Sequence, residues 1–131
     1  MRTRAIAVIT VAGLLFLSAC SSQDPVCDEL ETLKGSISSL GDISIEEGAL
    51  ADLQSTVSQI QTDLQAVRDA ADEKFGTELG TFESTLSELA DVVQGAVEAP
   101  SAASIAALVG EVGDTQQAWE TLKAAVPDCE L

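Results

Sequence analysis

The sequence contains no histidine and no tyrosine, and only one tryptophan and three phenylalanines occur among its 131 residues. Without histidine there is no Ser–His or Cys–His nucleophile, no imidazole metal ligand and no Glu-x-x-His motif of the carboxylate-bridged di-iron bundles. Glycine-rich phosphate loops and DxDxDG-like calcium loops are also absent from the sequence. We therefore expect no enzymatic activity, no metal site and no cofactor.

Basic side chains are scarce. Six lysines and arginines stand against 22 aspartates and glutamates, which gives a net charge of −16. Such a surface repels phosphate backbones, so nucleic acid is excluded as a partner. It also repels anionic lipid head groups, so any attachment to a membrane has to be covalent. Acidic chains with few aromatic residues are often disordered, but the apolar content of 46% and its regular spacing predict a folded domain.

The longest apolar run, from Ala5 to Leu17, is too short to cross a bilayer as a helix, which takes about 20 residues. Arg2 and Arg4 precede this run and small residues follow it, which is typical of a secretory signal peptide. The stretch Leu17-Ser18-Ala19-Cys20 then resembles the lipobox of bacterial lipoproteins. The resemblance covers residues 1–20. The alternative is ordinary cleavage after Ala19, which would release a soluble protein with a free thiol.

The lipobox resemblance implies that Cys20 receives a thioether-linked diacylglyceryl group, with palmitate-type acyl chains, and becomes the first residue after cleavage by the lipoprotein signal peptidase. Two acyl chains are enough for stable anchoring. We therefore expect a signal peptide at 1–19, a lipidated tether at 20–24 and one helical domain at 25–131. The expected location is the extracytoplasmic face of the cell membrane.

Heptad spacing predicts helices throughout residues 25–126. Asp24-Pro25 predicts the first helix start, Ser44 with Glu47 a capping box for the second, and Ser101 after Pro100 the cap of the last. The predicted core positions are Val26, Leu30, Leu33, Ile37, Leu40; Leu50, Leu53, Val57, Ile60, Leu64, Val67, Ala71; Phe75, Leu79, Phe82, Leu86, Leu89, Val93, Ala96; and Ile105, Leu108, Val112, Thr115, Trp119, Leu122, Val126.

The heptad slips by one residue where Lys74 takes an apolar position and Phe75 resumes the pattern. This slip is either a stutter in one long helix or a break between two helices, for which Thr77 is a candidate cap.

In an exported protein Cys27 and Cys129 are expected to form a disulfide. A free redox pair and an intermolecular bond are the alternatives. One continuous helix over 46–98 would be about 80 Å long and would hold the two cysteines roughly 20 Å apart, whereas a disulfide tolerates about 7 Å between Cα atoms. The sequence thus predicts an all-α, up-down-up-down four-helix bundle whose termini are joined by a disulfide.

Four residues are ambiguous between core and contact surface. Ile43 and Ile45, in the first loop, either cover the groove left by a short first helix or form an apolar tip for a partner. Trp119 is expected in the core, with a ligand-contacting ring as the alternative. Thr115 is expected to bond the backbone of its own helix.

The order of features is also similar to that of small secreted helical proteins of actinobacteria, to which no function is attached. We interpret the chain as a monomeric, membrane-anchored lipoprotein, with a structural or protein-interaction role in the cell envelope. Gly41–Glu47 and Glu98–Ser101 are its candidate contact loops. The alternative function is a carrier for a small apolar or lipid-like ligand between the helices, near Ala71, Ala96, Phe75 and Phe82.

Overall fold

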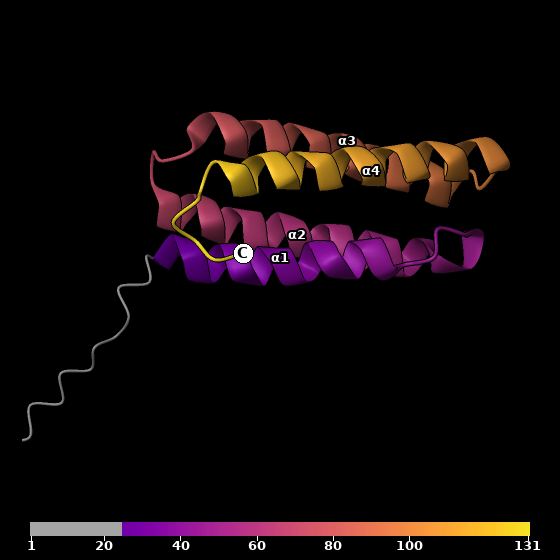
Figure 1. Ribbon diagram of the computed structural model, residues 1–131. Coiled ribbons are helices and arrows are strands. Elements are labelled where there is room, and N and C mark those ends of the chain that lie inside the picture. Colours follow the sequence, from indigo (N-terminus) through magenta and orange to yellow (C-terminus); the bar gives the residue numbers. More distant parts are fainter. Residues whose placement is uncertain (1–24) are drawn as a thin grey trace, which may run out of the picture.

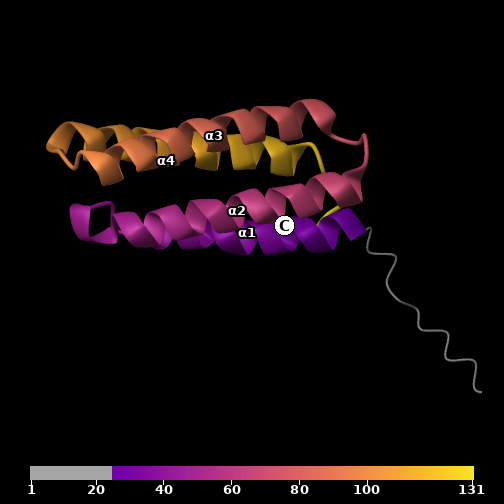
Figure 2. The same ribbon diagram turned by 180° about the vertical axis from the view of Figure 1, so that it is seen from behind.

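The computed structural model describes residues 25–131, which form four antiparallel helices (Figure 1). The helices are α1 (Pro25–Asp42), α2 (Leu50–Ala71), α3 (Gly76–Glu98) and α4 (Ala102–Ala124), and a short 3-10 helix, η1 (Glu47–Ala49), precedes α2. The α1–α2 hairpin forms one layer and the α3–α4 hairpin the other (Figures 1 and 2). The predicted up-down-up-down bundle is confirmed.

The core follows the predicted heptad seams closely. Apart from Phe75 and Ile105, which are half-buried near the ends of the bundle, every predicted core position is buried. Full burial of one Leu, Ile or Phe side chain contributes roughly 1.5–3 kcal/mol. Because none of the helices has a strong propensity of its own, this shared core is what stabilises them.

The link between α2 and α3 is a true break in the helix. Asp72 and Phe75 have φ values of 55° and 59°, in the left-handed region that side chains other than glycine rarely adopt. Two such residues within four positions end α2 and turn the chain back, so the slip in the heptad marks a turn and not a stutter. Phe75 occupies the N-cap position of α3, and the candidate cap Thr77 lies inside the first turn.

The two other predicted caps differ in outcome. Ser101 caps α4: its Oγ accepts from the backbone N–H of Ser104 at 3.0 Å, and Ser104 Oγ accepts from the N–H of Ser101 at 2.9 Å. The capping box predicted for Ser44 and Glu47 was wrong, because Glu46 is extended and α2 begins only at Leu50, after η1. Ile43 and Ile45 pack against the core and hold this stretch away from helical geometry.

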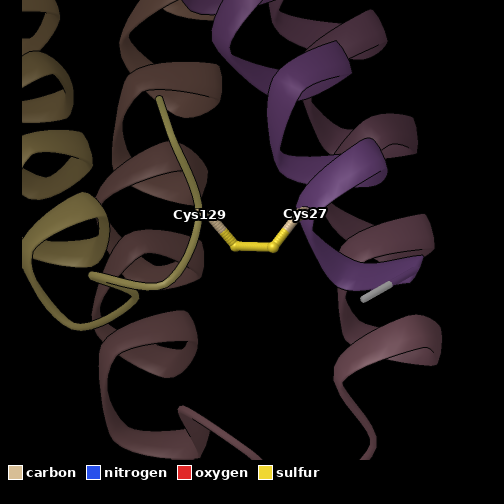
Figure 3. Close-up of a disulfide and its surroundings, with 2 residues drawn as sticks. All are labelled: Cys27 and Cys129. Carbon is tan, nitrogen blue, oxygen red and sulfur yellow. A yellow bond between two sulfur atoms is a disulfide. The ribbon is translucent and has the colours of Figure 1, made fainter. Parts of the chain in front are cut away.

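The disulfide between Cys27 and Cys129 joins the first turn of α1 to the tail that follows α4 (Figure 3). Its Cα atoms are 5.3 Å apart and it closes a loop with a sequence separation of 102 residues. The tail crosses from α4 to α1 to make this bond (Figure 1). The predicted intramolecular pairing of these cysteines is therefore confirmed.

Candidate functional site

The end of the bundle that contains the disulfide is also the end at which α1 begins, at Pro25. Cys20, the predicted lipid attachment residue, lies outside the described residues, as do the whole signal peptide and Asp24. From Cys20 to Pro25 the chain has five steps, which reach about 17 Å at most. A lipid on Cys20 would therefore hold this end of the bundle close to a membrane surface.

The opposite end is formed by the α1–α2 loop and the α3–α4 loop. Ile43 and Ile45 are half-buried and pack against the core. Neither side chain is fully exposed, as an apolar contact tip would be. The exposed residues of the two loops include the polar Ser44, Glu46 and Glu98 and the apolar Ala99 and Pro100.

Trp119 and Thr115 both belong to the core, as predicted. Trp119 is 5% exposed, and its ring meets that of Phe82 edge-on, with the centroids 6.5 Å apart and 65° between the ring planes. Thr115 is fully buried and donates from Oγ1 to the backbone oxygen of Glu111 at 2.8 Å. The edge contact with Phe82 holds the Trp119 ring in one orientation.

One side of the bundle is open. Of the neighbouring helix pairs, α1 and α4 pack least closely. Between them lies a groove of about 750 Å³ with Ile37 and Trp119 among its lining residues. Its other lining residues are polar or small: Lys34, Ser38, Gly41 and Asp42 from α1, and Gln116, Gln117, Glu120 and Lys123 from α4.

The ligand site expected near Ala71, Ala96, Phe75 and Phe82 is mostly filled by the core. Ala71, Ala96 and Phe82 are all at most 1% exposed. Phe75 is half-buried and lines a smaller pocket of about 260 Å³ beside the disulfide. The larger groove lies between α1 and α4. The sequence reasoning missed this groove, because it depends on how two helices distant in the chain are spaced.

A buried carboxylate was also missed. Asp63 of α2 is 6% exposed and accepts from Ser36 Oγ of α1 and, at 2.8 Å, from Nε2 of Gln59. Both Ser36 and Asp63 flank the seams of their helices, which is the signal that could have revealed the contact. Because the bond crosses the α1–α2 interface, it contributes to the alignment of the two helices.

On the next interface, the guanidinium of Arg68 on α2 forms an ion pair with the carboxylate of Glu83 on α3. Their side chains are 41% and 40% exposed. Exposed pairs of this kind contribute little to stability. We assign this pair a minor role in alignment and no chemical role.

Within residues 25–131, no cluster of three or more cysteine, aspartate or glutamate side chains has the arrangement of a metal site. No helix in the same range combines the length and apolarity needed to cross a membrane. Comparison with protein-family models, with curated proteins and with solved structures gives no match for this chain. The geometry of the bundle is therefore the basis on which its function is proposed.

Proposed function

We propose that this protein is a lipid-anchored module on the extracytoplasmic face of the cell membrane, where it holds a protein partner of the envelope at a set distance from the lipid surface. The observation that carries this proposal is that the two ends of the bundle are formed by different parts of the chain. The start of α1, to which the proposed tether connects in the chain, and the disulfide lie at one end, and the loops between α1 and α2 and between α3 and α4 lie at the other (Figure 1).

The helices set the length of this spacer. α3 and α4 have 23 residues each, which corresponds to about 35 Å at 1.5 Å per residue. A partner bound at the loops would thus lie about 35 Å from the tethered end. The exposed acidic residues Glu46, Glu47 and Glu98 in and beside these loops favour a partner with a basic surface.

The anchor is tested with the full chain expressed in a bacterial host. In the wild-type protein, Cys20 should become labelled with an alkyne-bearing fatty acid, and the protein should sediment with membranes. The Cys20→Ser variant should lose the label and leave the membrane fraction. A variant that still sediments without label would overturn the covalent anchor.

The partner is tested by placing a photoreactive residue at exposed positions in intact cells. Ser44 and Glu98 sample the two loops, and Gln61, exposed in the middle of α2, is the matched control. We expect crosslinked adducts from the loop positions and none from position 61. Adducts from position 61 alone would refute the assignment of the contact surface to the loops.

A further inference from the structure

We infer that the groove between α1 and α4 is a binding site for an amphipathic anion, whose single anionic group lies between Lys34 and Lys123 and whose apolar body lies over Ile37 and Trp119. This site is on the side of the bundle. It is independent of the lipid anchor and of the loops proposed above to contact a partner.

The two lysines lie at the same level on facing helices. Gly41 of α1 and Gln116 of α4 mark a point of close approach, because a Cβ atom on Gly41 would lie 2.8 Å from Nε2 of Gln116. Lys34 precedes Gly41 by seven residues and Lys123 follows Gln116 by seven. In antiparallel helices both steps run two turns toward the disulfide, so the lysines face each other across the groove.

Cations are scarce in this protein. Residues 25–131 carry four basic side chains: Lys34, Arg68, Lys74 and Lys123. Two of the four line this one groove. An anion between their ammonium groups would gain charge-assisted contacts.

Two acidic residues, Asp42 and Glu120, also line the groove. Lys123 pairs within its own helix with Glu120, at 3.0 Å from Nζ to Oε1, so an anionic ligand has to replace this carboxylate. Asp42 lies beside Gly41, two turns from the lysines. Lys34 forms no ion pair with any residue from 25 to 131. Among the described residues that line the groove, Lys34 is therefore the unpaired cation.

The floor of the groove fits an apolar body. Ile37 and Trp119 line it while being only 4% and 5% exposed, so they form its base and not its rim. The contact with Phe82 holds the indole in place. A volume of about 750 Å³ is in the range of small-molecule sites, which is typically about 300–1,000 Å³. The walls above this apolar base are polar.

The groove lies between two structural markers along α1. The Cys27–Cys129 bond is near the first turn of α1, and the close approach of Gly41 to Gln116 is near its last turn.

Trp119 is the only tryptophan and there is no tyrosine, so intrinsic fluorescence reports on this groove directly. The probe is dodecanoate, kept below its critical micelle concentration and titrated into residues 21–131, which contain every element of the bundle. We expect a saturable change in Trp119 emission. Dodecanol and dodecyltrimethylammonium, with the same chain and a neutral or cationic head, should bind at least about tenfold more weakly, because they lack the charge-assisted contacts.

Lys34→Gln and Lys123→Gln should each weaken dodecanoate binding about tenfold, the loss typical of one charge-assisted contact. Arg68→Gln is the matched control, since it removes one positive charge from the α2–α3 side and should leave affinity within about twofold. Circular dichroism verifies that each variant is folded. Titration with dodecyl phosphate identifies the head group: tighter binding than dodecanoate indicates a phosphate-bearing lipid, and weaker binding a free carboxylate.

Three results would overturn the site. Equal binding of dodecanol and dodecanoate would mean that the groove is only an apolar surface. An equal loss in Arg68→Gln and Lys34→Gln would mean that overall charge, and not the lysine pair, governs binding. If neither Trp119 fluorescence nor isothermal titration calorimetry detects binding of dodecanoate, no amphipathic anion binds in the groove.

Discussion

The hydroxyl of Ser36 on α1 donates a hydrogen bond to the carboxylate of Asp63 on α2, and the carboxylate is 6% exposed. This bond crosses from one helix of the first hairpin to the other. We expect Ser36→Ala to destabilise the protein by about 1–3 kcal/mol, because it leaves a buried carboxylate with one donor fewer. Urea unfolding measures the change, and Ser39→Ala, at an exposed position of the same helix, is the control.

The same pair can be tested for direct coupling. In Ser36→Ala/Asp63→Asn double-mutant cycles we expect an interaction free energy of about 0.5–3 kcal/mol. A coupling near zero would mean that the two side chains contribute independently, and the bond would then have no role in aligning α1 with α2.

The disulfide should provide a large share of the stability. In the chain-entropy model a closed loop of about 100 residues contributes about 4.7 kcal/mol. We therefore expect Cys27→Ser to lower the free energy of unfolding by about 2–5 kcal/mol, measured by denaturant unfolding without reductant. Adding reductant should lower the stability of the wild type to that of the variant and should not change the variant. A wild type insensitive to reductant would contradict this role.

Ser101, which caps α4, and Ser44, which caps no helix, form a matched pair for mutation. Ser101→Ala should cost about 1 kcal/mol, because Ser101 Oγ satisfies a backbone N–H at the start of α4. Ser44→Ala should change stability by less than about 0.5 kcal/mol, since no cap forms there. Thermal melts of the two variants measure the difference. An equal loss in both would mean that Ser44 caps a helix in solution.

Ile43 and Ile45 should behave as core residues. Each is half-buried against the bundle, so we expect Ile43→Ser and Ile45→Ser each to destabilise the protein by about 1–3 kcal/mol. Val109→Ser is the control, because Val109 is 55% exposed. Unchanged stability in the isoleucine variants would favour the alternative role, in which Ile43 and Ile45 form an apolar tip that contacts a partner.

Two glycines of α1 differ in their surroundings. A Cβ on Gly35 would meet nothing within 4 Å, so Gly35→Ala should stabilise α1 by about 0.5–1 kcal/mol through helix propensity. At Gly41 the added carbon would lie 2.8 Å from Nε2 of Gln116. Gly41→Ala should therefore gain less, since the Gln116 side chain has to move. Denaturant unfolding compares the two variants, and an equal gain would mean that α1 and α4 are not in close contact at Gly41.

Most of the fold could be predicted because the heptad seam is a local property of each helix. Leu30, Leu53, Leu86 and Leu108 are core residues by spacing alone, and the reach of the Cys27–Cys129 bond was enough to divide α2 from α3. The start of α2 could not be predicted in the same way. There, packing of Ile43 and Ile45 against distant residues overrides the local capping pattern of Ser44 and Glu47.

The groove and its lysines were beyond sequence reasoning for a different reason. Lys34 and Lys123 are unremarkable surface positions within their own helices, and their facing arrangement depends on the relative level of α1 and α4. That level is set by contacts between residues far apart in the chain, such as Gly41 with Gln116. Likewise, Asp63 is an ordinary polar residue until α1 places Ser36 against it.

The bond between Cys27 and Cys129 also decides what a single proteolytic cut can release. A protease that cleaves the exposed α3–α4 loop divides the backbone, but the piece that carries α4 remains covalently attached to the start of α1. A nicked molecule therefore keeps all four helices together, and its fragments separate only after reduction. On the lipid anchor proposed above, a cut in this loop alone would not shed the domain.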